Sequence, residues 1–290
     1  MAQRSINWAI QRHYQRAKTL GKAAGKTWAE DDIHRFRVEV KKLRACLRLA
    51  GATRMGLDPR LPGKLRAFYD MVGVIRCLQL QRKGLVEAAV RMEMELPEIC
   101  SSILDDRIQT AVAVGKAYLQ LRAPLGKPRS EWQVPVHRHR AIVGVDAFLK
   151  AGKDDLLVGD VLPDEAGLLA LRKVMKDILY TAPYFREGNA LSCLPTKFAS
   201  KAALEMCVDK LGEFHDICLQ LQLLKDNSSL AHVNSSVALF LEATRQLWQQ
   251  DKAVKLGALR TLLLPFIETG QENPLSPSLL NAESFELHID

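Results

Sequence analysis

The chain has 290 residues, and 48% of them are hydrophobic, which is enough to bury a sizeable core in one large domain or two smaller ones. The 41 Lys and Arg residues exceed the 33 Asp and Glu residues and give a net charge of +8. This excess favours anionic partners in general, whether nucleic acid, a phosphate polymer or a membrane surface. The sequence shows neither a membrane-spanning apolar stretch nor a signal-type amino terminus, so we expect a cytoplasmic protein that does not enter a membrane.

Apolar residues recur along most of the chain with the period of about 3.6 residues that is typical of helices. Alternation of the strand type is nearly absent. The pattern therefore predicts an all-α fold. The predicted helices cover residues 3–20, 30–50, 61–95, 100–121, 164–182, 198–225 and 231–268.

Residues 33–51, with the sequence IHRFRVEVKKLRACLRLAG, form the most basic of these helices. They contain seven Lys, Arg and His residues and a single acid, Glu39. At about 100° per residue, the spacing puts five of the basic residues on one stripe beside an apolar stripe. The basic stripe consists of His34, Arg37, Lys41, Arg44 and Arg48. Glu39 falls on the other flank, where helical spacing pairs it with Arg35 and Lys42.

The absence of an acid within this stripe favours a binding surface over an ordinary solvated face. Solvated faces mix charges of both signs, and like charges at i,i+4 repel by a few tenths of a kcal/mol per pair. The neighbouring apolar stripe also suggests the wall of a groove, where attraction for an anion is stronger. We therefore predict that the stripe binds an anion.

The spacing of the basic stripe recurs in LLALRKVMKDILY, residues 168–180. The residues that fall 135 positions after the first three members of the stripe are Leu169, Arg172 and Lys176. Further along each half, VGVIRCLQLQ (72–81) resembles LGEFHDICLQLQ (211–222), and in each segment a Gly is followed three residues later by Arg76 or His215. The repetition predicts two similar helical halves. Packing about a pseudo-two-fold axis would direct both basic helices towards one cavity.

Pro, Gly and charged residues collect in residues 122–163, which we interpret as a linker. The prediction is a single domain over residues 1–270, made of internal repeats at about 1–125 and 140–270. Residues 271–290 are acidic and interrupted by prolines, as in a loosely held tail.

These motifs resemble the signatures of the CHAD domain family, which is named for a histidine in an α-helical domain. IHRFRVEVKKLR looks like the first signature, and the second signature and both Gly-containing segments also fit, over roughly residues 5 to 268. The resemblance implies two four-helix bundles related by pseudo-two-fold symmetry around a basic central pore. It also implies binding of inorganic polyphosphate and association with polyphosphate granules.

The resemblance carries specific residues over to this chain. The expected polyphosphate ligands are His34, Arg37, Lys41, Arg44, Arg172 and Lys176. Leu169 stands where the second signature has His, which predicts fewer phosphate contacts from the second half. Cys77 stands where the first Gly-containing segment has Asp, a change that we expect to alter local geometry more than affinity.

Further basic residues border the motifs and complete the candidate polyphosphate-binding set: Lys42, Arg48, Arg76, Lys173, Lys201 and His215. Lys201 is explained slightly better as a solvated residue at a helix start than as a ligand. Two roles are open for His34, which could contact phosphate or hydrogen-bond to a neighbouring helix. Beside an anion His34 would gain charge, so binding should strengthen as the pH falls.

The residue chemistry favours binding over catalysis. Guanidinium and ammonium groups suit a phosphate chain, whereas phosphoanhydride cleavage usually needs a divalent metal held by convergent carboxylates, which the basic helices lack. His137 and His139 have no nearby acid or Cys to complete a metal site, and the six cysteines form no CxxC pair and are expected to be reduced core thiols. We predict a protein that is not an enzyme and has neither metal nor cofactor.

Two alternatives stay open. One is an enzyme or accessory protein for phosphoryl transfer or hydrolysis on polyphosphate. The other is binding of nucleic acid or other polyanions without regard to sequence. Aromatic residues make up only 6% of the chain, which is poor material for stacking on bases, but contact with a phosphate backbone does not require them.

Overall fold

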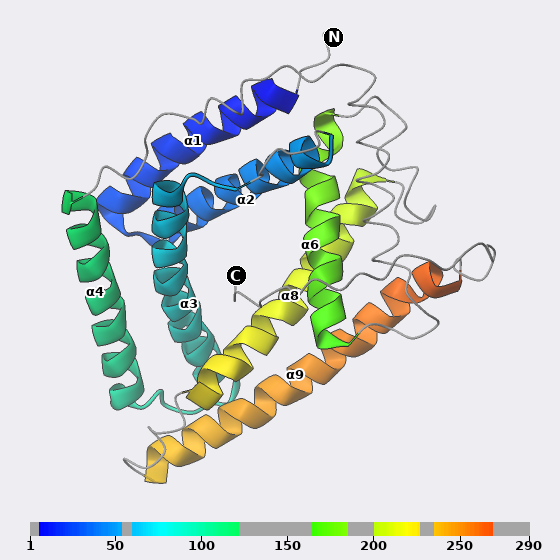
Figure 1. Cartoon of the computed structure of the whole chain (residues 1–290). Coiled ribbons are helices and arrows are strands. Elements are labelled where there is room, and N and C mark those ends of the chain that lie inside the picture. Colours follow the sequence, from blue (N-terminus) through cyan, green and yellow to red (C-terminus); the bar gives the residue numbers. More distant parts are fainter. Residues whose placement is uncertain (1–5, 54–59, 122–163, 185–199, 227–234, 269–290) are drawn as a thin grey trace, which may run out of the picture.

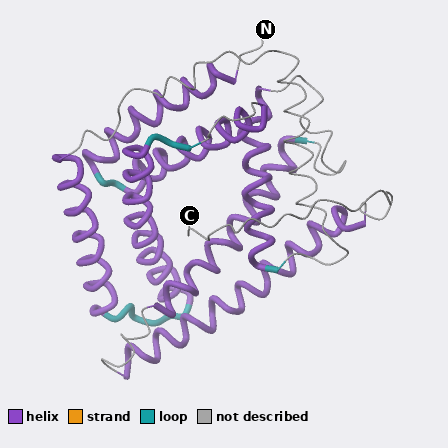
Figure 2. The backbone as a smooth tube through the Cα atoms, viewed as in Figure 1, coloured by secondary structure: helices purple, strands orange, loops and turns teal. Residues whose placement is uncertain are grey.

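The computed structural model describes residues 6–53, 60–121, 164–184, 200–226 and 235–268. All regular secondary structure in these residues is helical, which confirms the predicted all-α fold for the described part of the chain (Figure 2). The elements are α1 (Ile6–Thr27), α2 (Glu30–Thr53), α3 (Gly63–Arg91), α4 (Glu98–Leu121), α6 (Glu165–Thr181), the 3₁₀ turn η2 (Ala182–Tyr184), α8 (Lys201–Asp226) and α9 (Ser235–Glu268). The proposed linker at 122–163, the tail at 271–290 and the pair His137 and His139 lie outside the described residues.

Helices α2, α3, α8 and α6 form a four-sided frame (Figure 1). Each packs against the next, α2 on α3, α3 on α8, α8 on α6 and α6 on α2. Helix α1 lies along α2, α4 along α3 and α9 along α8, on the outside of the frame. The frame helices are those that carry the two basic patterns and the two Gly-containing segments, so the fold brings all four motifs to one assembly of helices.

The apolar residues form two core clusters, and α3 belongs to both. Its first part packs with α1 and α2, where the Phe36 and Phe68 rings lie 5.1 Å apart. Its last part, including Leu85 and Ala88, packs with the second half of the chain. The two halves of the sequence therefore share core helices. Their pseudo-two-fold relation stays a prediction.

Glu39 shows where spacing on one helix was misleading. It does not pair with Arg35, which instead donates to Asp32 over 3.1 Å. Glu39 is only 2% exposed, and its Oε1 lies 2.7 Å from His13 Nδ1 and 3.5 Å from Arg16 Nε of α1. The physical reason is burial: α1 covers this flank of α2, and a buried carboxylate needs a partner from the element that covers it.

A charged pair joins α2 to α6 across 129 residues of sequence. Arg48 Nε donates to Asp177 Oδ2 over 2.6 Å and Nη2 donates to Oδ1 over 2.5 Å. Asp177 is 7% exposed. A two-pronged bond of this kind fixes orientation as well as distance, so it sets how the two basic helices face one another.

Helix α1 continues to Thr27, beyond the end at residue 20 that the sequence predicted. A Cβ at Gly25 would lie 2.6 Å from Leu119 of α4, so the glycine lets the two helices approach. Trp28, with a left-handed φ of 54°, then turns the chain towards α2. Its indole fills the space beside Gly115, where a Cβ would lie 2.3 Å from Trp28 Cη2.

This packing gives a matched pair of glycine substitutions. Gly115→Ala should lower the free energy of unfolding by about 1–3 kcal/mol, because the new methyl group overlaps a buried ring. Gly257→Ala in α9, where nothing lies within 4 Å of the new Cβ, should raise it by about 0.5–1 kcal/mol through helix propensity. Urea unfolding followed by circular dichroism measures both. Equal effects of the two substitutions would contradict the packing of Trp28 on α4.

Candidate functional site

Basic side chains of all four frame helices lie close enough for their charges to influence the pKa values of His34, Cys77, Lys176 and His215, although burial is the first cause of each shift. Arg44 joins them because its guanidinium and that of Arg37 lie over the same Tyr69 ring, at 5.8 and 4.3 Å. We call this set the basic cluster. It consists of His34, Arg37, Lys41 and Arg44 of α2, Arg76 of α3, Arg172 and Lys176 of α6, and His215 of α8.

A glycine of each repeated segment lies beside an arginine of a basic pattern. A Cβ at Gly73 would lie 2.5 Å from Arg37 Nη1, so this glycine makes room for the guanidinium. A Cβ at Gly212 would lie 3.5 Å from Arg172 Nη2, which is an ordinary van der Waals distance, so Arg172 lies next to Gly212 without requiring a glycine there. The sequence pointed to both glycines, but the structure gives a packing reason only for Gly73.

Two arginines of the first half already have protein partners. Arg37 Nη1 donates to the Tyr69 carbonyl over 2.9 Å. Arg76 Nη1 donates to Glu30 Oε1 over 2.5 Å, with 17% of the Arg76 side chain exposed. These two side chains therefore serve as ties between α2 and α3, in addition to any contact with a ligand.

In the second half, the basic side chains of the cluster lack such partners among the described residues. Arg172 Nε and His215 Nδ1 are buried atoms, and among the described residues neither has a hydrogen-bond partner. Lys176 makes no ion pair with any described carboxylate within 4 Å. Buried polar atoms without a partner, such as Arg172 Nε and His215 Nδ1, are rare in folded proteins unless a ligand or water completes them.

Burial and mutual repulsion disfavour the charged forms in the cluster. Burial, and then the charge of Arg172, lowers the pKa of Lys176 to about 8, although Asp216 and Asp209 oppose the shift. Burial and Arg172 also lower the pKa of His215. For His34, burial and the charges of Arg76 and Lys41 act in the same direction. An anion in the cluster would relieve this repulsion.

His34 is exposed and makes no hydrogen bond to any described residue. Both of its predicted roles, contact with phosphate and a hydrogen bond to a neighbouring helix, stay predictions.

Four predicted ligands lie outside the basic cluster. Arg48 is taken up by Asp177. Lys42 Nζ lies 5.9 Å from the Tyr180 ring. Lys173 is exposed, and Lys201, also exposed, lies 3.4 Å from Glu205 in the first turn of α8. Tyr180 was not predicted, although it follows Lys176 by four residues and so falls on the same helical stripe.

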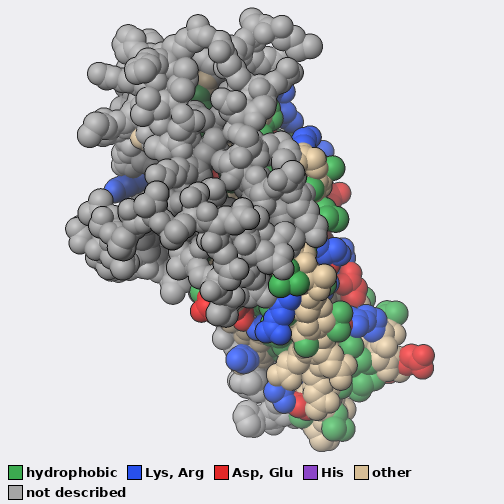
Figure 3. Space-filling model, turned by 90° about the vertical axis from the view of Figure 1, so that its right-hand side faces the viewer, with side chains coloured by type: hydrophobic (Ala, Val, Ile, Leu, Met, Phe, Trp, Pro, Cys, Tyr) green, Lys and Arg blue, Asp and Glu red, His purple; other side chains and the backbone are tan. Residues whose placement is uncertain are grey.

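Away from the cluster, several basic side chains are paired with acids, for example Arg91 with Asp251 and Lys252 with Glu165. Figure 3 shows acidic side chains beside Lys and Arg on the described part of that face. Charges of both signs therefore lie together on this part of the surface.

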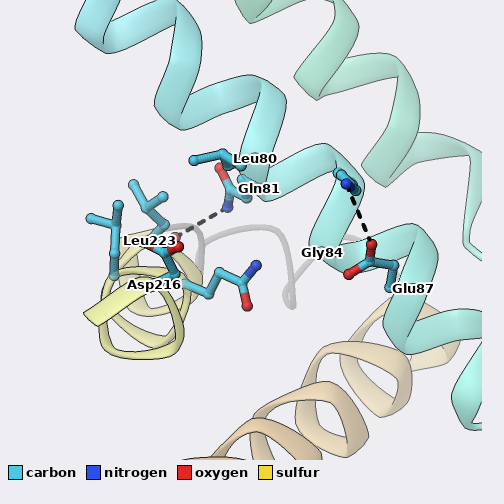
Figure 4. Close-up of a pocket in the computed structure, with 9 residues that line it drawn as sticks. Leu80, Gln81, Gly84, Glu87, Asp216 and Leu223 are labelled. Atoms are coloured by element: carbon cyan, nitrogen blue, oxygen red, sulfur yellow. Dashed lines mark hydrogen bonds and ion pairs between the residues drawn. The ribbon is translucent and has the colours of Figure 1, made fainter. Parts of the chain in front are cut away.

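A pocket adjoins the cluster where α3 and α8 cross (Figure 4). Its polar lining includes Gln81, Gln220 and Asp216. Gln81 Nε2 donates to the Leu223 carbonyl over 3.5 Å, and Lys83 at the edge lies 3.9 Å from Glu87. Because amides and acids dominate this lining, the pocket is not suited to a polyanion.

The described residues contain no group of three or more His, Cys, Asp and Glu side chains placed to hold a metal ion. None of the described helices is both long and apolar enough to cross a membrane. The cysteines in the described ranges are unpaired thiols, and all except the half-buried Cys77 are buried, as the sequence predicted.

Comparison with known proteins bears on the fold. No model of a protein family matches the chain, and no curated protein sequence matches it. Among solved structures, the chain is similar to the crystal structure of the CHAD domain from the plant Ricinus communis, with a TM-score of 0.58 and 14% sequence identity. The match covers 89% of this chain and 90% of the plant chain. At this identity the match concerns the fold alone, and it agrees with the resemblance of the sequence motifs: the chain has the CHAD fold.

Proposed function

We propose that the protein is a non-catalytic module that binds inorganic polyphosphate in the basic cluster. The observation that carries the proposal is the convergence of cationic side chains from four separate helices. Burial and neighbouring positive charges disfavour the charged forms of three of them, His34, Lys176 and His215. Cations held this close together repel one another in the unliganded protein, and a bound anion offsets this repulsion. The CHAD fold and the sequence motifs support the same function.

The chemistry of the polymer matches the cluster. Polyphosphate carries dense negative charge and offers no bases, so a receptor needs rows of guanidinium forks and ammonium groups and no stacking surface. The cluster supplies both kinds of cation from helices that face one another. A basic pore through the frame, location in the cytoplasm and association with polyphosphate granules belong to this proposal.

Competition between polyanions tests the proposal directly. Labelled long-chain polyphosphate should bind at about 0.15 M salt, where nonspecific ionic contacts are weakened. Unlabelled polyphosphate should displace it at far lower phosphate concentration than single-stranded DNA or RNA. Equal displacement by all three would indicate a general anion-binding surface. Release of orthophosphate from the polymer in the presence of Mg²⁺ would show an enzyme instead.

Charge reversal tests whether the cluster is the site. Lys41→Glu combined with Lys176→Glu should lower the affinity for polyphosphate by about 100-fold or more, since two attractive contacts become repulsive. Circular dichroism should show unchanged helical content. The control is Lys22→Glu with Lys225→Glu, which alters two exposed lysines of α1 and α8 and changes the net charge equally. A similar loss in both variants would mean that net charge, and not the cluster, governs binding.

A further inference from the structure

The two halves of the basic cluster use their cations differently. In the first half, Arg37 and Arg76 are bound to Tyr69 and Glu30. In the second half, Arg172 Nε and His215 Nδ1 lack a partner among the described residues. The sequence predicted that the second half makes fewer phosphate contacts than the first, because Leu169 replaces a His in the second signature. The contacts instead make the second half the better candidate for the tightest phosphate contact.

The second-half groups are close to one another. Arg172 and Lys176 are one turn apart on α6, and the Arg172 guanidinium lies against Gly212 of α8, three residues before His215. Arg172 Nε is 3.6 Å from the position of a Cβ on Gly212. A phosphoryl group here could accept from Arg172 and His215 while Lys176 balances its charge.

We propose that Arg172, Lys176 and His215 form the primary phosphoryl subsite of the cluster, and that a proton moves from solvent to the Lys176 amine as the subsite fills. This inference rests on the proposed function. No bond between heavy atoms is made or broken. The neutral amine forms one N–H bond with a proton that the buffer acid gives up, and it becomes an ammonium ion that faces the phosphate oxygens.

The groups around Lys176 explain why this residue takes up a proton when phosphate binds. The charged and titratable groups that face the subsite are His34 and Lys41 of α2, Arg76 and Cys77 of α3, Arg172 and Tyr180 of α6, and Asp209 and Asp216 of α8. Burial and Arg172 hold the pKa of Lys176 at about 8, below its ordinary value of 10.5. A bound phosphate adds negative charge and shifts this pKa back upwards. Between these two values, filling the subsite therefore requires proton uptake, and affinity falls as the pH rises.

Isothermal titration calorimetry at pH 9, in two buffers of different ionisation enthalpy, counts the protons. At this pH the polymer is fully ionised, so a proton taken up can go only to the protein. The wild type should take up about one proton per filled subsite. Lys176→Arg should bind polyphosphate at pH 7 with similar affinity but take up none at pH 9, because arginine is already charged. Lys225→Arg, an exposed lysine at the end of α8, should keep the uptake.

A second pair of variants tests the subsite itself. At pH 7, Arg172→Gln should weaken polyphosphate binding by about tenfold or more, and Arg37→Gln should weaken it less. Without polymer, Arg37→Gln should lower the urea midpoint because it removes the bond to Tyr69, whereas Arg172→Gln should leave the midpoint nearly unchanged.

The outcomes separate this inference from the proposed function. Polyphosphate binding without proton uptake at pH 9, uptake retained in Lys176→Arg, or a larger loss of affinity in Arg37→Gln than in Arg172→Gln would overturn the subsite and leave polyphosphate binding in place. No binding by the wild type at pH 7 would overturn both.

Discussion

Repulsion among the cations of the basic cluster is the constraint that the rest of the structure must offset. Helices with facing positive charges stay together only if other contacts hold them. The apolar clusters supply most of this attraction, because α3 packs into both. The fork from Arg48 to Asp177 joins the two basic helices directly, and the bond from Arg37 to Tyr69 ties α2 to α3. The basic cluster is thus a destabilised region within a frame that is stable elsewhere.

The arginines of the cluster differ in whether they bond to the protein, and this difference follows from the same constraint. A guanidinium bound to a carbonyl or carboxylate stabilises the fold and has fewer donors left for a ligand. Arg37 and Arg76 are of this kind, and Arg172 is not. Two residues at equivalent places in a sequence repeat can therefore have different roles, which depend on the partners that their own half of the chain provides.

The sequence predicted the helices and the cationic composition of the cluster well, because both follow from local periodicity and from residue type. It failed where a distant element decided the outcome. Glu39 pairs with His13 because α1 covers it, and the close approach of α1 to α4 depends on the glycine at position 25 beside Leu119. Arg48 fitted the basic stripe, yet Asp177, 129 residues away, binds it. The low pKa of Lys176 depends on burial between α6 and its neighbours, which no spacing on one helix can reveal.

The closed frame also has a consequence for biosynthesis. Helices α2 and α3 leave the ribosome long before α6 and α8, so the nascent chain carries five of the eight cluster residues before the helices that face them are made. A chain truncated after α4 would lack Arg172, Lys176 and His215, and would leave the last turns of α3 without the second core. Assembly of the halves is thus the step that creates the site. Any anion that binds only the assembled frame will favour this step by mass action.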